Sequence, residues 1–404
     1  MSEGTLLDVV YCEGWDPAAR ALIGRLSPGT ARERDAAGEQ YAVALVRPGT
    51  EVPLLLLEIA WKHCYARSVQ FDELGRRRGF FEFRVLEDSA LFLMKVEQWT
   101  YRFDDQEEFD KKSAGRTEMS FGPDGKGWMH QAPQGYGGGS SSGQVTKQVS
   151  ELTMPKPAFG DWEPLAKSGP LTLRTPDAPD TDPPLPVDER PWRPSVPLRP
   201  SGMDEMFTAG TRFSLRGDHG LVEVELRDAG KLRMPSGRLV ASDPSFLDTD
   251  TEHFTVTVPP GEYRVEVSVI RFVDEPEHER VAAAKLIVAD VPVATWETAL
   301  WAGQHALFLG EGEFYGYGVD SGTGCFADAT ALPEEMDDDL LEKFEEVDPY
   351  IDVTPEGADG NVIAFTTGWG DGSYPTWIGR AADGTPVCFV TDMLVLNHAQ
   401  VQTA

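Results

Sequence analysis

Hydrophobic and polar residues alternate most clearly between residues 80 and 101. Phe81, Phe83 and Val85 are separated by charged or polar neighbours, which gives the two-residue period of a half-buried strand. Residues 90–101 read as a second strand, and residues 87–89 supply the polar turn between the two. The pattern therefore predicts an antiparallel hairpin in the N-terminal part of the chain.

The pattern before residue 80 is less uniform. Residues 41–47 and 53–61 are rich in Val, Leu and Ile, and the second run leaves strand and helix both open because its apolar positions define no single period. A helix is expected from Pro17, with Asp16 as its N-cap, because proline is well tolerated at the first helical position. Residues 1–130 are therefore expected to form an α+β domain with an antiparallel sheet.

Strand patterns dominate from about residue 205 to the end of the chain. Alternation is clear in residues 221–226 and 263–269, and residues 362–366 and 386–396 add apolar runs between turn signals. Short strands of this kind predict a β-rich domain over residues 205–404, built as an antiparallel sandwich or a strongly bent sheet. The fold class expected for the whole chain is α+β, with the smaller α+β domain first and the mostly β domain second.

One helix is expected in this second domain, over Glu334–Val347. Leu340, Phe344 and Val347 lie on one stripe of such a helix and are expected to face the core. Its outer face is almost wholly acidic, and the acidic residues of its first turn complement the positive end of the helix dipole. The second domain is therefore expected to present one acidic helix at its surface.

A change of composition separates the two predicted domains. Residues 134–143 are rich in glycine and serine, and prolines recur throughout residues 155–200. Proline at that density disfavours helix interiors and sheet centres. Residues 131–204 are therefore expected to connect the domains as an ordered but irregular segment, with Trp162 and Trp192 fixing it to a domain surface.

The charge of the chain limits the class of partner. The 404 residues include 67 acidic and 36 basic side chains, which gives a formal net charge of −31. A surface this negative repels phosphate backbones, so nucleic acid is not an expected partner. It suits a basic protein partner, although an acidic surface also serves solubility alone.

The sequence gives no sign of a membrane protein. The run Val52–Ala60 contains a proline and a glutamate and is far too short to cross a bilayer. The start, Met1–Gly4, lacks the positively charged segment of a secretory leader. The cysteines form no CxxC pair, which favours reduced thiols and predicts a cytoplasmic protein. They are Cys12, Cys64, Cys325 and Cys388.

Four segments of the C-terminal half stand in the order that they have in a known bacterial family. They are LRMPSGRLVASDP at 232–244, VPPGEYRV at 258–265 with RVAAAKL at 280–286, WETAL at 296–300 leading to YGVDSGTGCFADA at 317–329, and GDGSYPTWIG at 370–379. With these segments, residues 205–397 resemble the family called domain of unknown function 4241. The resemblance implies a common fold and no activity, because the family has none assigned. The N-terminal half resembles no family that we can name.

The segment 317–329 is the densest cluster of candidate site residues. Its glycines permit close backbone approach, and its polar side chains offer several chemistries. Cys325 as a nucleophile requires a neighbour that lowers the pKa of its thiol, and otherwise it is a small buried side chain. Asp320 and Asp328, with Ser321 between them, offer the hard oxygens that Ca²⁺ or Mg²⁺ prefers, although the spacing fits no EF-hand.

Two other polar segments carry similar alternatives. Ser236 and Asp243 either line a polar pocket, with Asp243 as base or ligand, or sit in two turns that flank one strand. Trp369, Asp371 and Tyr374 either form aromatic walls and an anchor for a ligand, or belong to a hairpin turn. If a site exists, it is expected where residues 317–329 meet these two segments.

The sequence assigns no catalytic residue, cofactor or metal ion. No histidine spacing typical of zinc hydrolases and no nucleotide-binding glycine motif is present. The tentative binding residues are Ser236, Asp243, Asp320, Ser321, Cys325, Asp328, Trp369, Asp371 and Tyr374.

The favoured hypothesis is a non-enzymatic binding or interaction protein, because turn loops on a β scaffold often carry recognition. A specific version is an immunity protein that neutralises a basic toxin with its acidic helix. The alternative is a small-molecule-binding, hydrolase-like enzyme with a carboxylate-rich site, which requires Asp243, Asp320, Cys325 and Asp371 to converge. A third interpretation makes the C-terminal domain a scaffold and gives specificity to the N-terminal one. The sequence does not define the oligomeric state.

Overall fold

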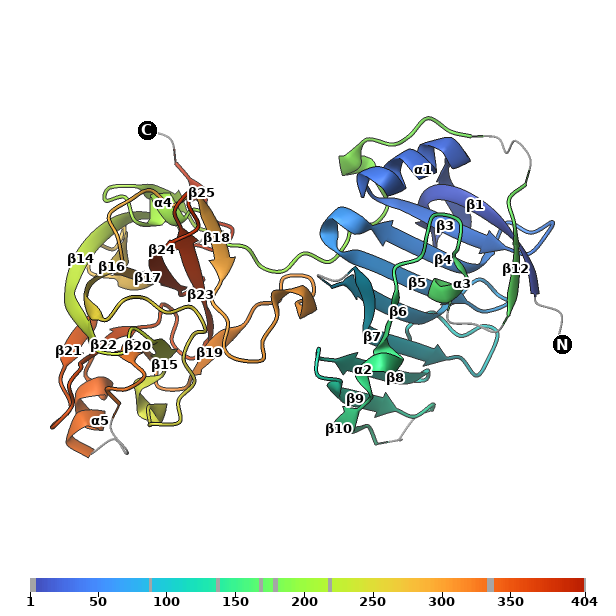
Figure 1. The fold of residues 1–404 in the computed structure, drawn as a ribbon. Helices are drawn as coiled ribbons and strands as arrows, with labels where there is room; N and C mark the ends of the chain where they lie inside the picture. The colour runs from blue at the N-terminus through green and yellow to red at the C-terminus, as the bar shows by residue number, and fades with distance from the viewer. Residues whose placement is uncertain are drawn as a thin grey trace. The chain divides into compact units, whose positions relative to one another are not determined.

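The chain divides into two compact units, Met1–Ser195 and Val196–Ala404, and each is described by itself. The computed structural model describes residues 5–86, 89–135, 139–166, 170–176, 181–216, 220–332 and 338–402. Residues 87 and 88 of the predicted hairpin turn lie outside these ranges. Figure 1 shows the elements of both units.

Unit 1 is built on one large antiparallel sheet. In its described part, twelve strands follow the order β10-β9-β8-β7-β6-β5-β4-β3-β1-β12, with β11 paired to β7 and β2 paired to β1. Most neighbours in the sheet are therefore neighbours in sequence, while β12 joins β1 in parallel. The strands are β1 Thr5–Asp16, β2 Ala21–Arg25, β3 Tyr41–Val46, β4 Pro53–Ala60, β5 Tyr65–Phe71, β6 Arg77–Val85, β7 Ala90–Thr100, β8 Gly115–Phe121, β9 Lys126–Ala132, β10 Ser141–Thr146, β11 Thr153–Pro155 and β12 Leu171–Arg174.

Short helices accompany the sheet of unit 1. They are α1 Pro28–Ala37, α2 Val149–Leu152 and α3 Glu163–Ala166, with 3₁₀ turns at Trp61–His63 and Val187–Glu189. The open alternative at residues 53–61 is decided in favour of a strand, because β4 pairs with both β3 and β5 and its side chains are buried on both faces.

The helix predicted from Pro17 is wrong. Residues 17–20 form a turn between β1 and β2, in which Asp16 Oδ1 accepts the amides of Ala18 and Ala19 at 2.8 and 3.0 Å. An Asp–Pro pair can cap either a helix or a turn. Here the pairing of β1 with β2 on either side of residues 17–20 favours the turn. The helix begins at Pro28 instead, where Ser27 Oγ accepts the Thr30 amide at 3.0 Å.

Residues 131–204, expected as a connector, lie largely within unit 1, which extends to Ser195. The segment supplies β10, β11 and β12, and its tryptophans are buried against the sheet. Trp162 is fully buried beside Tyr41, with ring centroids 6.3 Å apart. Trp192 stacks on Tyr65 at 6.2 Å. These large apolar rings make it favourable for a proline-rich segment to stay on the sheet.

A buried ion pair fixes this segment and α1 to β1. Glu13 is 1% exposed, and both of its carboxylate oxygens accept hydrogen bonds from Arg34 of α1, at 2.7 and 2.9 Å. The amide of Leu185 donates to the same carboxylate at 2.9 Å. A charge this deeply buried is tolerated because the guanidinium and the amide replace the lost water.

We expect Arg34→Met to lower the free energy of unfolding of unit 1 by about 3 kcal/mol. It removes both guanidinium hydrogen bonds of the buried Glu13 carboxylate, which keeps only the Leu185 amide and the Arg190 guanidinium 3.8 Å away. Arg25→Met is the matched control, since Arg25 pairs with the exposed Glu51 and its loss should cost under about 1 kcal/mol. Urea unfolding followed by circular dichroism measures both. Equal costs for the two variants would contradict the structural role assigned to Glu13.

Unit 2 consists of two antiparallel sheets in its described part. The larger follows the order β18-β23-β24-β17-β16-β14-β13-β25, with β19 also paired to β23, and the smaller follows β15-β20-β22-β21. The strands are β13 Arg212–Ser214, β14 Leu221–Met234, β15 Leu239–Ser242, β16 Gly261–Phe272, β17 Glu279–Ile287, β18 Thr295–Thr298, β19 Gly316–Val319, β20 Thr323–Asp328, β21 Tyr350–Val353, β22 Val362–Thr366, β23 Gly372–Arg380, β24 Pro386–Asp392 and β25 Gln400–Val401. Helices α4 Met203–Met206 and α5 Asp338–Glu345 and 3₁₀ turns at Pro244–Phe246 and Ala306–Phe308 complete the unit.

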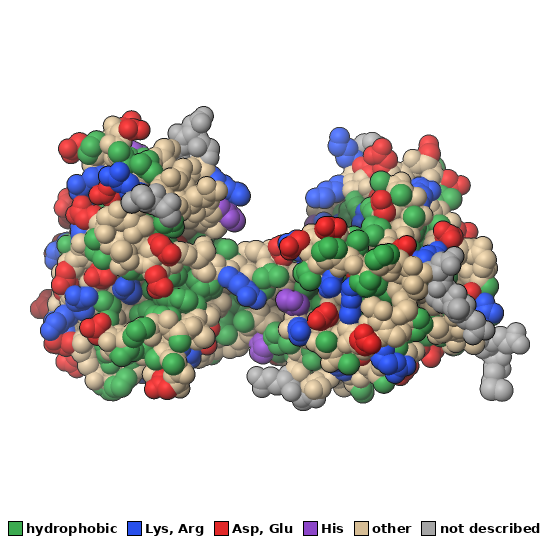
Figure 2. All heavy atoms as spheres, turned by 90° about the horizontal axis from the view of Figure 1, so that it is seen from above, with side chains coloured by type: hydrophobic (Ala, Val, Ile, Leu, Met, Phe, Trp, Pro, Cys, Tyr) green, Lys and Arg blue, Asp and Glu red, His purple; other side chains and the backbone are tan. Residues whose placement is uncertain are grey.

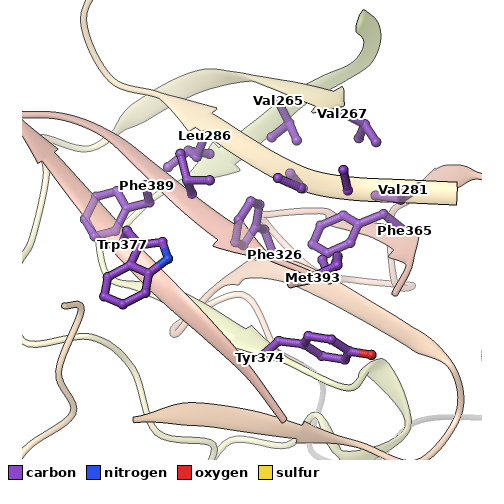
Figure 3. Close-up of a cluster of buried hydrophobic side chains, with 14 of the residues drawn as sticks. Val265, Val267, Val281, Leu286, Phe326, Phe365, Tyr374, Trp377, Phe389 and Met393 are labelled. Carbon is purple, nitrogen blue, oxygen red and sulfur yellow. The ribbon is translucent and has the colours of Figure 1, made fainter. Parts of the chain in front are cut away.

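The core of unit 2 lies between these sheets (Figure 3). Val265 of β16, Leu286 of β17 and Phe389 of β24 are buried on the larger sheet. Phe326 of β20 and Phe365 of β22 face them from the smaller sheet, with their rings 5.2 Å apart. The predicted fold class, α+β with a mostly β C-terminal domain, is confirmed.

Helix α5 packs on the outside of the smaller sheet. Leu340, Phe344 and Val347 are buried with side chains of β15, β20 and β22, as their spacing predicts. The first residues of the predicted helix, 334–337, lie outside the described residues. Glu342 and Glu345 are exposed on its outer face.

Candidate functional site

The structure brings together the three polar segments that the sequence marks. Strand β15 pairs with β20, so that Ser242 lies opposite Cys325. Strand β19 pairs with β23, and the Thr367 amide donates to the Gly322 carbonyl at 3.0 Å. Residues 236–243, 317–329 and 367–374 therefore form one continuous region of unit 2.

Asp243 holds the turn between β19 and β20. Its side chain is fully buried, and its Oδ2 accepts the amides of Asp320 and Ser321, both at 2.9 Å. Its Oδ1 accepts the Ser321 hydroxyl at 2.9 Å and the Ser245 amide at 2.8 Å. Four donors of the chain occupy this carboxylate, so its hydrogen-bonding capacity is used by the fold.

Asp328 plays the same part at the other end of β20. It is fully buried, and its carboxylate accepts the amide and hydroxyl of both Ser236 and Thr330 at 2.6 to 3.0 Å. Burial alone would raise the pKa of Asp328, but the hydrogen bonds from Thr330 and Ser236 outweigh it and lower the pKa. Ser236 is thus a donor, as predicted, but to Asp328 rather than to a ligand.

Cys325 does not have the environment of a nucleophile. Its side chain is fully buried between β15 and β22, and its thiol donates to the Ser242 carbonyl at 3.3 Å. Burial raises the pKa of the Cys325 thiol, and the Asp243 carboxylate raises it further. The thiol is therefore protonated at neutral pH and acts as a small core side chain.

The exposed part of this region consists of turns. Asp320, Ser321 and Asp371 are exposed, and Trp369 is 55% exposed with the Arg280 guanidinium 5.5 Å from its ring centre. Tyr374, expected as a second aromatic wall, is instead 5% exposed. Its hydroxyl donates to carbonyls of the 367–370 turn, so it supports the turn from inside.

The structure does not favour a cation site at these residues. Asp328 is occupied by Ser236 and Thr330, and Asp320 lies beyond the opposite end of β20. Within the described ranges, no group of three or more His, Cys, Asp or Glu side chains is placed to hold a metal ion. A Ca²⁺ or Mg²⁺ ion would find too few free oxygens here.

Several hollows, among them one in each unit, are lined by residues other than those that the sequence marks. In unit 1, a cleft of about 380 Å³ is lined by charged and aromatic side chains of β5, β6 and β7 and by Phe109. Its three cations are already paired: Arg67 with Glu58 at 2.6 Å, Arg77 with Glu108 at 2.8 Å, and Lys95 with Glu118 at 2.7 Å. In unit 2, a cavity of about 520 Å³ lies on the larger sheet. Its residues come from distant segments with no common motif, so no local signal could have found it.

Sequence reasoning also missed one buried carboxylate. Asp392, at the end of β24, is 7% exposed, and its Oδ1 accepts the Leu394 amide at 2.8 Å. Burial raises the pKa of Asp392 to about 6, although the hydrogen bond from the Leu394 amide and the nearby Trp377 side chain oppose this rise. Asp328 has more donors than Asp392, and in Asp328 these donors outweigh the effect of burial on the pKa.

Unit 2 is thus a two-sheet β domain in which polar residues of the candidate site stabilise loops. Residues 232–391 match the family model DUF4241, described as a protein of unknown function. This match confirms the resemblance seen in the sequence and contains every predicted site residue. The N-terminal region matches no family model, and no curated protein and no solved structure matches the chain.

We expect Asp243→Asn to lower the free energy of unfolding of unit 2 by about 3 kcal/mol. Each oxygen of the Asp243 carboxylate accepts two hydrogen bonds, and the substitution replaces one oxygen with an NH₂ group, which cannot accept them. Asp371→Asn, at an exposed turn, is the control and should change stability by less than about 0.5 kcal/mol. Thermal unfolding of the full chain measures both. Retained stability in Asp243→Asn would leave this carboxylate free for another role.

We expect Asp392 to make unit 2 less stable as the pH rises. Because its pKa is raised in the folded state, its contribution is fully present below the pKa of the unfolded chain and is lost as the pH rises through about 6. Asp392→Asn should remove this loss and stabilise unit 2 by about 2 kcal/mol at pH 7.5, with little effect near pH 4. Urea unfolding across this pH range measures the difference, and parallel curves for the two proteins would refute the assignment.

Proposed function

We propose that the protein is a non-enzymatic binding protein whose partner is a basic protein. The observation that carries this proposal is the use of the candidate catalytic groups by the fold. Asp243 and Asp328 are surrounded by donors of the chain, and the Cys325 thiol is buried and protonated. The exposed remainder of the region, including Trp369 and Asp371, consists of turns of the kind that recognise partners.

The hydrolase-like alternative requires the same groups to be free for chemistry. The segments that carry Asp243, Asp320, Cys325 and Asp371 do lie together, but catalysis also requires these side chains to be available to a substrate. A general base needs an accessible lone pair, and a thiol nucleophile needs a lowered pKa. The hydrogen bonds of Asp243 and the burial of Cys325 supply neither.

The acidic face of α5 supports a basic partner. Asp339, Glu342 and Glu346 are exposed and recur at intervals of three and four residues, which places them on one side of the helix, where Lys343 is the one exposed cation of α5. Within the described part of the chain, none of these carboxylates forms an ion pair, whereas Glu225, Glu279 and Glu297 of the larger sheet all pair with arginines. Unpaired carboxylates keep their charge available to a partner.

The specific version of this proposal is an immunity protein that occludes a basic toxin with the α5 face. The place of action that we propose is the cytoplasm, since the four cysteines are free in the structure. No helix in the described residues has the length and apolarity needed to cross a membrane. Acidic and basic side chains are interspersed on the faces seen in Figure 2, so a basic partner would need a local acidic face.

Affinity capture with the full chain from lysate of the native host tests this proposal. We expect a basic protein to be enriched at low salt and released as the salt rises, because screening weakens exposed charge pairs. Neutralising the α5 face by Asp339→Asn, Glu342→Gln and Glu346→Gln should weaken capture roughly tenfold, since each exposed contact is worth about 0.5 kcal/mol.

The control removes the same number of charges from the turn between β16 and β17. It carries Asp274→Asn, Glu275→Gln and Glu277→Gln, all at exposed positions, and should capture as the unaltered chain does. If no partner is recovered even at low salt, the proposed function is refuted. If both variants capture equally, the partner does not use α5.

A further inference from the structure

The cavity on the larger sheet of unit 2 has a floor made by one cross-strand row. Arg264 of β16 lies opposite Ile287 of β17, which lies opposite Cys388 of β24. Cys388 lies opposite Gly379 of β23, and Gly379 lies opposite Trp296 of β18. Side chains in such a row point to the same face of the sheet. Five separate strands therefore contribute to one surface, which none of the candidate site residues lines.

Two segments wall this floor. On one side, α4 and Phe207 are held by the Ser268 hydroxyl, which donates to the Met206 carbonyl at 2.6 Å. On the other side, residues 289–293 begin where the Ala289 amide donates to the Val387 carbonyl at 3.1 Å. Both walls are thus attached to the sheet, and the cavity of about 520 Å³ between them has the size of a small-molecule site.

Gly379 allows the side chains of Val293 and Trp296 to pack closely against the sheet at one end of the cavity. A Cβ at this position would lie 2.6 Å from the Cys388 sulfur, 2.8 Å from a Val293 methyl carbon and 3.2 Å from the Trp296 ring. All three side chains therefore lean into the space that the glycine leaves open. The result is a wall made of an indole ring and a branched aliphatic side chain.

The two cations of the cavity share one carboxylate, so that three acidic and two basic side chains line the cavity in all. Glu266 lies 3.4 Å from both Arg264 and Lys285, opposite Lys285 on the neighbouring strand. The Lys285 ammonium also lies 3.8 Å from the centre of the Phe207 ring. Arg264 and Lys285 thus have partners within the protein, and an anionic ligand would have to compete with Glu266 for both.

Two carboxylates of the cavity are not neutralised. Asp204 belongs to α4 and Asp290 to the opposite wall, and both are exposed. Across the ranges that the structure describes, neither forms an ion pair. An anionic ligand would meet this charge as repulsion, whereas a cation would meet it as attraction. The aromatic face of Trp296 also favours a cation.

We propose that this cavity binds a small organic cation, namely an ammonium or guanidinium group on an apolar stem. The charged group lies near Asp204 and Asp290, and the stem packs on Trp296 and Ile287. This site is independent of the partner proposed above. A free amine and a lysine side chain of another protein offer the same chemistry, and the experiment below separates them.

Titration of the full chain with hexylammonium, hexanol and hexanoate tests the charge preference by calorimetry. Each of these probes contains six carbon atoms, and they differ in the charge of the head group. We expect hexylammonium to bind about tenfold more tightly than hexanol, and hexanoate to bind most weakly. Hexanol or hexanoate binding as tightly as hexylammonium would overturn the proposal, as would the absence of hexylammonium binding.

Variants assign the binding to this cavity. Asp204→Asn with Asp290→Asn should weaken hexylammonium about tenfold and leave hexanol unchanged. Asp274→Asn with Glu277→Gln, outside the cavity, should change neither. Equal hexylammonium affinity in the first variant and the unaltered chain would refute the role of these carboxylates.

Cys388 lines the floor and reports occupancy through its rate of labelling, which is slow because the side chain is 5% exposed and burial raises the pKa of its thiol to about 11. In a Cys64→Ser background, which removes the other cysteine that is not fully buried, saturating hexylammonium should slow maleimide labelling of Cys388 several-fold. Labelling that is unchanged at saturation would place the probe elsewhere and overturn the proposal.

A capped Gly-Ser peptide with one central lysine separates the two sources of the cation. Binding tighter than that of hexylammonium supports a protein side chain as the natural occupant, and weaker binding supports a free amine. Either result supports a cation site, provided that Asp204→Asn with Asp290→Asn weakens it. Failure of every probe would refute this site and leave the capture experiment with the α5 variant unaffected.

Discussion

A buried carboxylate must be surrounded by donors of the chain, and this constraint organises both units. Glu13 joins a helix and a distant proline-rich segment to the first strand of unit 1. Asp243 and Asp328 stand at the two ends of β20 and hold the turns on either side of it. Each carboxylate costs free energy to desolvate and recovers it only when these contacts are complete. The loops around them are therefore fixed in position, although glycines would otherwise leave them many conformations.

The same constraint explains how the polar cluster around β20 uses its carboxylates. The two oxygens of a carboxylate accept a limited number of hydrogen bonds. A carboxylate that uses all of them to fix a turn has none left for a substrate. Asp243 uses both oxygens for the fold. Asp392 has fewer donors, and its raised pKa is the cost of incomplete compensation. Carboxylates that are buried to a similar extent thus differ in the number of donors that the chain gives them.

Local patterns predicted the fold class and much of the strand set, because two-residue alternation is a property of neighbouring residues, as in 263–269. They failed at Pro17, where the Asp–Pro pair suits a turn as well as a helix and strand pairing decides. The meeting of residues 236–243, 317–329 and 367–374 was expected from the family-like order of the segments. The roles of these residues were not expected, because three of the four donors to Asp243 come from residues 77 and 78 positions away along the chain.

The cavity of unit 2 is even harder to predict from the sequence. Its floor depends on the register of five strands, and a shift of one residue in any of them would turn that strand's contribution to the opposite face. Arg264, Cys388 and Trp296 are unremarkable in their own segments and acquire a common role only through this register. All three lie within residues 232–391, which match the family model. A site defined by register persists as long as the sheet does, so any protein that shares this sheet is a natural place to look for the same cavity with different charges on its walls.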